Sequence, residues 1–292
     1  MTPPDFNRSL SHRLRNRAEE LGVDPGRLRR HLVFQRILAR LAKGDIWVLK
    51  GGFSLEVQLQ LRGRATKDLD MVVSETPNSA LDLQDLLDEI LETNSEDRFT
   101  FEVGLPKPLP ARDLGAPGWR LKVRALYTNA LFETVTLDVV SAADEVGGGL
   151  QEIVIEPIIS TDEFAPTTMT AVDIPQHAAE KIHAYCRIYS GEQPSSRVKD
   201  LIDLVLLIEA GLLDPTEWAE RCRHVFDVRA DTPLPEKLEA PPASWAQPYL
   251  QTAAELDLTA ADLDSAFSLV EALYTTAFAI PASQKATNGH AQ

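Results

Sequence analysis

The stretches Leu49-Lys50-Gly51-Gly52-Phe53-Ser54 and Arg64-Ala65-Thr66-Lys67-Asp68-Leu69-Asp70 decide the fold prediction for this chain of 292 residues. The apolar run 46–49 predicts a short buried strand, and the glycine pair breaks it before a helix over 53–59. The second stretch leads into another strand over 68–73. A glycine turn at the start of a helix lets the backbone approach a ligand and favours anions. The two stretches together predict an anion site beside an acidic strand.

The acidic strand carries the predicted chemistry. Asp68 and Asp70 are separated by one residue, so they share one face of the strand. Two such carboxylates repel each other unless a cation lies between them, and hard oxygen ligands suit Mg²⁺, with Mn²⁺ as the alternative. Asp138, inside the apolar strand 134–140, is the candidate third carboxylate, because a buried aspartate needs a metal or an ionic partner. An ion pair with an arginine such as Arg124 is the alternative explanation for Asp138.

The rest of the chain divides by pattern. Residues 1–44 have helical periodicity, residues 45–165 mix strands with helices, and residues 166–280 are helical, followed by a small polar tail, 281–292, that we predict to be disordered. This order predicts an α+β fold, a mixed sheet flanked by helices and followed by an all-helical C-terminal domain. The further elements predicted are strands at 99–103, 119–126, 132–140 and 153–155, and helices at 7–21, 79–93, 176–190, 197–210, 215–226, 247–256 and 260–280.

Composition narrows the class of protein. The net charge of −15 argues against a uniformly basic nucleic-acid-binding surface. Residues 8–43 contain ten cationic residues and only three acidic ones. This basic N-terminal arm could therefore still contact a polyanion locally. Two distant cysteines, the lack of an apolar leader and the lack of a run of about 20 apolar residues predict a cytoplasmic protein without a membrane span.

A second block lies in the helical half. Glu180-Lys181-Ile182-His183-Ala184 falls on one predicted helix, and Arg197-Val198-Lys199-Asp200-Leu201-Ile202-Asp203-Leu204 begins the next. Lys199 and Asp203 are one helical turn apart, and a solvated ion pair between them is the simplest explanation of that spacing. A lone lysine such as Lys181 is usually a surface residue. The second block therefore indicates a functional site only in combination with the glycine and aspartate stretches at 49–54 and 64–70.

The string K-G-G-x-S-L…R-x-T-x-D-L-D resembles the AbiEii/AbiGii family of nucleotidyltransferases, the MenT-like toxins of type IV toxin–antitoxin systems. The broader resemblance is to the DNA polymerase β-like nucleotidyltransferase superfamily, in which a glycine-serine pair precedes Asp-x-Asp and a third aspartate. Here Phe53 separates Gly52 from Ser54. The resemblance covers about residues 45–210, and the lysine and R-x-K-D-x-x-D-L strings of the second block support it.

The resemblance implies a nucleotidyltransferase-like sheet and a reaction in which a nucleoside triphosphate gives its nucleotide to RNA, the tRNA 3′ end in particular. It implies Mg²⁺ bound by Asp68, Asp70 and Asp138, a catalytic Lys181 at the triphosphate, and a cognate antitoxin as partner. The nucleotide-binding residues it implies are Gly51, Gly52, Ser54, Thr66, Lys67, Lys181, Lys199 and Asp203.

Three alternatives stay open at this point. The acceptor could be a small hydroxylated molecule, as in enzymes that modify aminoglycosides. It could be protein, including the chain itself at Thr66 or a nearby serine. The chain could also be a non-catalytic binding module with a decayed site, although all three candidate carboxylates are present.

Overall fold

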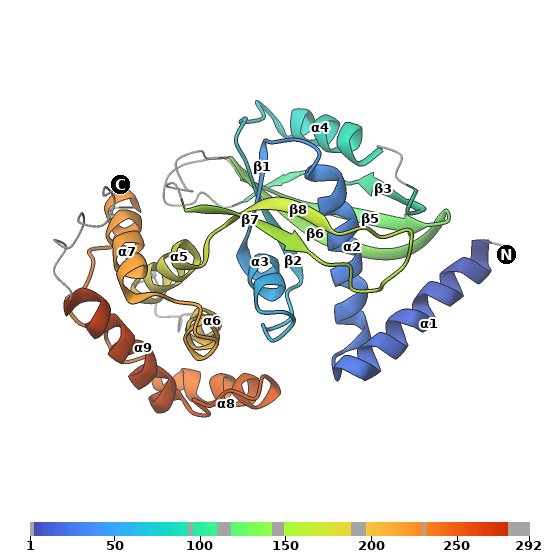
Figure 1. The fold of residues 1–292 in the computed structure, drawn as a ribbon. Helices are drawn as coiled ribbons and strands as arrows, with labels where there is room; N and C mark the ends of the chain where they lie inside the picture. The colour runs from blue at the N-terminus through green and yellow to red at the C-terminus, as the bar shows by residue number, and fades with distance from the viewer. Residues whose placement is uncertain are drawn as a thin grey trace, which may run out of the picture. The chain divides into compact units, whose positions relative to one another are not determined.

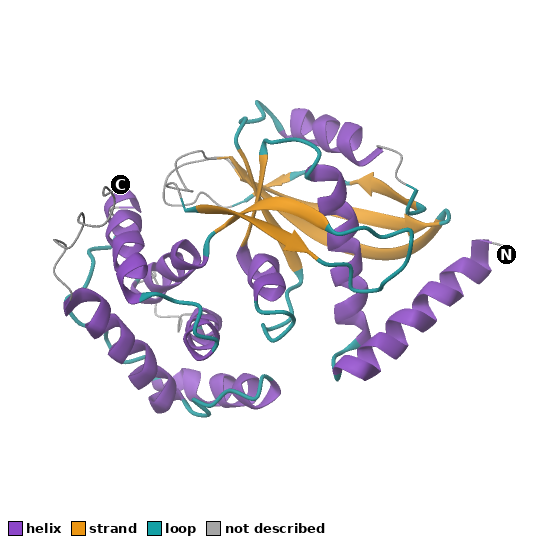
Figure 2. Ribbon diagram, viewed as in Figure 1, coloured by secondary structure: helices purple, strands orange, loops and turns teal. Residues whose placement is uncertain are grey.

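The computed structural model describes residues 3–92, 96–109, 118–141, 149–187, 197–229 and 232–279. They form two compact units, which divide between Asp173 and Ile174. Figure 1 labels helices and strands of both units where there is room, and Figure 2 distinguishes helices from strands. The tail at 281–292 that we predicted to be disordered lies outside the described residues.

The first unit is built on one mixed sheet, drawn as arrows in Figure 2. Its strands follow the order β3-β5-β6-β2-β1-β8-β7, with β4 paired to β5. The pairs β2–β6 and β1–β8 are parallel, and the other pairs are antiparallel. The strands are β1 (Trp47–Lys50), β2 (Asp68–Val73), β3 (Phe99–Val103), β4 (Lys107–Pro108), β5 (Gly118–Tyr127), β6 (Ala130–Ser141), β7 (Leu150–Ile155) and β8 (Thr167–Val172).

Helices of the first unit cover one face of this sheet, which we call the inner face. They are α1 (Pro3–Leu21), α2 (Pro25–Leu41), α3 (Gly51–Gln58) and α4 (Ala80–Glu92). Leucines of α2 and α4 share one buried core with Leu69, Leu121 and Leu137 of the strands. The N-terminal helices therefore belong to the same compact unit as the sheet, whereas the sequence pattern had set residues 1–44 apart.

The alternation of side chains along each strand decides what the opposite, outer face carries. On β2, Leu69 and Met71 are fully buried in the core, so Asp68 and Asp70 point to the outer face. On β6, the buried Leu137 and Val139 flank Asp138 in the same way. The apolar packing on one side of the sheet thus places the acids together on the other side.

The second unit is helical and has its own core. It contains α5 (Ile174–Cys186), α6 (Val198–Glu209), α7 (Pro215–Arg229), a short 3₁₀ helix at Ala243–Trp245, α8 (Ala246–Glu255) and α9 (Leu263–Ala279). Trp218 of α7 and Tyr274 of α9 are almost fully buried and pack edge to face at 6.0 Å between ring centroids. None of the described helices combines the length and the apolar character that crossing a bilayer requires.

Candidate active site

A row of four charged side chains crosses the outer face of the sheet. The strand register pairs Lys50 with Asp70, Asp70 with Asp138, and Asp138 with Arg120. Residues paired in register point to the same face, and Asp68, two residues before Asp70, points there as well. The three predicted carboxylates therefore share one face of two adjacent parallel strands, between two cationic side chains.

The guanidinium of Arg120 binds Asp138 through two hydrogen bonds. Its Nε donates to Oδ1 at 2.8 Å and its terminal Nη2 donates to Oδ2 at 2.7 Å. The same Nη2 lies 3.8 Å from Oδ2 of Asp68. The hydrogen bonds that Arg120 donates to Asp138, with the charges of all three aspartates, raise the pKa of Arg120 well above its ordinary value, despite partial desolvation. In this structure the cation between the carboxylates is thus an arginine side chain.

Asp138 pairs with Arg120 and not with Arg124, the arginine that the sequence suggested as a partner. Arg124 pairs instead with Glu102 on β3. The register explains the difference, because Arg124 lies opposite Thr134, four residues before Asp138 on β6. Only the residue directly across from Asp138 on β5 can make the two-pronged contact.

Both positions of the turn require glycine, because the acidic strand and the loop before it lie close to the backbone of the turn. Gly51 has φ +70°, and a Cβ there would lie 2.0 Å from Oδ2 of Asp70. A Cβ on Gly52 would lie 2.8 Å from Oγ1 of Thr66. The turn at the start of α3 and the Thr66–Asp70 segment therefore form one packed piece.

A buried ion pair holds the loop that leads into β2. Glu56 of α3 accepts a hydrogen bond from Nε of Arg27 at 2.6 Å and from the backbone N–H of Thr66 at 3.3 Å. Arg27 also donates to the carbonyl oxygen of Gly63 at 2.6 Å. Burial acts to raise the pKa of Glu56, but the nearby imidazole of His31 and the charge of Arg27 outweigh it, so this pKa is lowered. Glu56 thus stays ionised and fixes the loop.

The other predicted residues of the first unit differ in accessibility. Ser54 is fully buried, and its hydroxyl accepts a hydrogen bond from Gln58 at 3.0 Å. Thr66 is also buried, and its hydroxyl donates to the carbonyl oxygen of Asp68 at 3.1 Å. Lys67 is exposed. A role for Ser54 in nucleotide contact stays a prediction, which needs movement of the helix start.

The second unit contains the other predicted cluster. Nζ of Lys181 on α5 lies 2.6 Å from Oδ2 of Asp203 and 3.4 Å from Oδ1 of Asp200, both on α6. Arg197 also contacts Asp200, at 3.4 Å. Asp203 is buried and pairs with Lys181 rather than with Lys199, which is exposed. The solvated Lys199–Asp203 pair suggested by the spacing is therefore wrong.

The donor chemistry of the outer face suits a hard divalent cation. Within the described ranges, no three side chains of His, Cys, Asp or Glu already stand in the arrangement of a metal site. Asp68, Asp70 and Asp138 nevertheless supply carboxylate oxygens on one face, which Mg²⁺ prefers. The contact of Arg120 with two of these aspartates shows that a cation is accommodated between them. The residues fit Mg²⁺, provided that Arg120 releases Asp138.

The arginines of α2 are largely committed to the interior of the first unit. Arg40 contacts both carboxylate oxygens of Asp97, at 3.0 and 2.9 Å, and Arg36 lies 3.9 Å from the same group. Arg27 pairs with Glu56, as described above. These three arginines are buried and stabilise the packing of α2. The exposed arginines of the arm lie on α1; they are Arg8, Arg13, Arg15 and Arg17.

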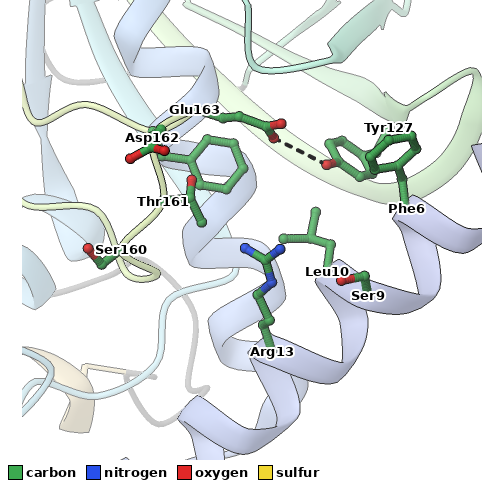
Figure 3. A pocket seen from close by; sticks show the side chains of 10 residues that line it. Phe6, Ser9, Leu10, Arg13, Tyr127, Ser160, Thr161, Asp162 and Glu163 are labelled. Carbon is green, nitrogen blue, oxygen red and sulfur yellow. Dashed lines mark hydrogen bonds between the residues drawn. The ribbon is translucent and has the colours of Figure 1, made fainter. Parts of the chain in front are cut away.

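Two cavities lie apart from the predicted residues. One, of about 480 Å³, is lined by α1, the end of β5 and the 160–164 loop of the first unit. Figure 3 shows Tyr127 at its wall, beside Glu163. The hydroxyl of Tyr127 lies 3.5 Å from Oε2 of Glu163, whose other carboxylate oxygen pairs with Arg98 at 2.9 Å. The other, of about 440 Å³, lies in the helical unit beside Tyr185 and Trp245. Neither cavity contains any of the residues predicted for the nucleotide.

The first unit thus combines a mixed sheet, flanking helices and an outer face that carries three aspartates. The profile described as "Nucleotidyl transferase AbiEii toxin, Type IV TA system" matches residues 33–276. The chain therefore belongs to the AbiEii family of nucleotidyltransferase toxins of type IV toxin–antitoxin systems. The match extends on both sides of residues 45–210, the range in which we recognised motifs. No curated protein matches the sequence significantly.

The solved structures similar to this chain have low sequence identity to it. MenT4, a nucleotidyltransferase toxin from Mycobacterium tuberculosis H37Rv, is 19% identical with a TM-score of 0.52, over 85% of this chain and 82% of its own. JHP933 from Helicobacter pylori is 18% identical with a TM-score of 0.40, over 88% of this chain and 97% of its own. The similarity to MenT4 supports the predicted fold class.

Proposed function

We propose that this protein is a Mg²⁺-dependent toxin that transfers a nucleoside monophosphate from a nucleoside triphosphate to RNA, at the tRNA 3′ end, and so blocks translation in the cytoplasm. Membership of the AbiEii family supports the triphosphate as substrate and an antitoxin as partner. The observation that carries the proposal is the register of Asp70 with Asp138, with Asp68 on the same face. This arrangement brings three carboxylates together beside a glycine turn.

The chemistry follows from these residues. Mg²⁺, or Mn²⁺ in its place, held by Asp68, Asp70 and Asp138 would neutralise the triphosphate and favour ionisation of the acceptor hydroxyl. Asp138 takes the proton of that hydroxyl, whose oxygen attacks the α-phosphorus. A new oxygen–phosphorus bond forms as the bond to the α–β bridging oxygen breaks, and pyrophosphate leaves. Gly51 leaves room for Asp70 to keep its position during this step. Positioning and charge neutralisation supply most of the rate gain.

The remaining predicted residues bind the nucleotide in this proposal. Lys181 offsets negative charge that develops on the leaving pyrophosphate, and its family resemblance supports that role. Its contact with Asp203 orients the ammonium group. The residues proposed to bind the nucleotide with Lys181 are Gly51, Gly52, Ser54, Thr66, Lys67, Lys199 and Asp203.

The test is transfer of label from each of the four nucleoside triphosphates to total cellular RNA, with Mg²⁺ present. We expect a labelled band of tRNA size with the native protein and none with Asp68→Ala. Asp82→Asn, an exposed acid on α4, is the matched control and should stay fully active. Full activity of a folded Asp68→Ala protein would overturn the mechanism.

The alternative acceptors predict different products in the same assay. A small-molecule acceptor gives labelled small hydroxylated compounds and no labelled RNA. Self-modification gives a mass increase of the protein itself, but the hydroxyl of Thr66 is buried and hydrogen-bonded, which disfavours that site. A non-catalytic module would bind ATP, CTP, GTP or UTP in calorimetry and form no product.

A further inference from the structure

Three cations follow one another on the outer face of β5. Arg120, Lys122 and Arg124 occupy alternate positions and are all exposed, while the residues between them, Leu121 and Val123, are buried in the core. Alternate residues of a strand point to one side, so the three cations form a line, which we call the β5 stripe. Its length is about 13 Å, at about 3.3 Å per residue.

The β5 stripe begins at the carboxylates and runs away from them. Arg120 lies opposite Asp138, and Lys122 lies opposite Thr136, which in turn pairs with Asp68 on β2. Arg124 is one further step along, opposite Thr134. A ligand lying along the stripe would therefore have one end at the proposed reaction centre and the rest over β5 and β6.

The cations at the far end of the β5 stripe are available for anions. Nζ of Lys122 donates to the hydroxyl of Thr136 at 2.5 Å, and within the described residues it has no acidic partner. Arg124 pairs with Glu102, but both side chains are about half exposed, at 51% each. Exposed ion pairs of this kind contribute little to stability, so a phosphate can replace the carboxylate at little cost.

The length of the stripe decides which anion it suits. A triphosphate reacting at the carboxylates needs cations near Arg120, but Arg124 lies four residues further along the strand. A neutral small acceptor needs no line of cations. A chain of regularly spaced phosphates matches cations spaced at about 6.6 Å along an extended strand.

We propose that the β5 stripe binds the backbone phosphates of a polynucleotide acceptor and directs its 3′ end to Asp68, Asp70 and Asp138. This inference rests on the proposed function and specifies the surface that receives the acceptor. It assigns that role to β5 rather than to the exposed arginines of α1. On a chain with net charge −15, such a line is a local exception to the acidic surface.

The test compares two double variants of the full chain with equal charge change. Lys122→Glu/Arg124→Glu removes the distal stripe, and Arg8→Glu/Arg15→Glu removes two exposed arginines of α1. Fluorescence anisotropy with labelled tRNA, without nucleotide, is measured at several salt concentrations. We expect the β5 variant to bind about tenfold more weakly, with a salt slope lower by about 2, and the α1 variant to bind like the native protein.

Two further measurements keep the outcomes distinct. Calorimetry with a non-hydrolysable triphosphate and Mg²⁺ should give the same affinity for the β5 variant and the native protein. Lys122→Gln/Arg124→Gln, which introduces no new charge beside Glu102, should also bind tRNA more weakly than the native protein, though less so than the Glu variant. Weaker triphosphate binding by the β5 variants, or equal tRNA losses in the β5 and α1 variants, would overturn the proposal. If the β5 variants bind tRNA as tightly as the native protein does while Asp68→Ala is inactive, the proposed role of the β5 stripe is overturned. The proposed function would still stand.

Discussion

Replacing Gly51 with alanine tests whether the glycine turn holds Asp70 in its reactive position. The backbone of Gly51 has φ +70°, which disfavours any residue with a Cβ. The added Cβ would lie 2.0 Å from Oδ2 of Asp70 and 2.8 Å from its Cβ. Both the carboxylate and the backbone of β2 would have to retreat from the turn.

The expected size of the effect follows from these distances. Ordinary contacts between heavy atoms begin near about 3.5 Å, so the carboxylate must move by about 1.5 Å and its Cβ by about 0.7 Å. A displacement of about 1 Å in a catalytic group lowers the rate by about a hundredfold. The left-handed backbone adds about 1 kcal/mol of strain, and overpacking adds about 1–2 kcal/mol to the loss of unfolding free energy.

The chain offers a control for each part of this effect. Gly22 has φ +65° with nothing within 4 Å of a Cβ, so Gly22→Ala measures backbone strain alone. Gly52→Ala pushes on Thr66, at 2.8 Å, and leaves Asp70 untouched. Unfolding free energy from urea titration, Mn²⁺ affinity from calorimetry and the transfer rate would be compared for all three variants. If Gly51→Ala lost no more stability than Gly22→Ala and kept native activity, Asp70 would not depend on the turn.

The remaining predictions concern the two ion pairs around the site. Arg120→Gln should lower the unfolding free energy of the metal-free protein by about 1.5 kcal/mol, because Asp138 loses a charged partner that is half exposed. Mn²⁺ should then raise its Tm more than that of the native protein; equal shifts would argue that Asp138 binds no metal. Glu56→Gln should cost about 3 kcal/mol near neutral pH, because Arg27 stays buried without a counter-charge. The pKa of Glu56 is lowered by folding, so this difference is present above the unfolded pKa of about 4.3 and shrinks as pH falls below it. A difference independent of pH would contradict the ionised state of Glu56.

Most elements could be predicted from the sequence because their apolar periodicity is strong. The predicted strand 68–73 coincides with β2, and the predicted strand 99–103 coincides with β3. Asp24, which precedes a proline, caps α2, since its Oδ1 accepts a hydrogen bond from the N–H of Arg27 at 2.8 Å. These local signals needed no knowledge of the tertiary structure.

The missed strands lack that local signal. β8 has the sequence Thr167-Thr168-Met169-Thr170-Ala171-Val172, in which small and hydroxylated residues dominate, so no local pattern marks it as a strand. It becomes a strand because it pairs with β1 on one side and β7 on the other. β8 therefore lies in the range 166–280 that we had predicted as helical, and the helical unit begins eight residues later. Pairing partners distant in sequence supply what the local pattern could not.

The same distinction applies to the site. Asp68, Asp70 and Asp138 could be chosen from the sequence because acids at strand positions otherwise occupied by apolar residues are costly. The role of Arg120 could not be predicted, although the alternation of basic and apolar residues along β5 was visible in the sequence. Which cation faces Asp138 depends on the β5–β6 register, and a shift by two residues would place Lys122 there instead. The ammonium group of a lysine in that place could not form the two parallel hydrogen bonds that Arg120 makes. The register therefore decides both how Asp138 is neutralised and where the line of cations along β5 begins.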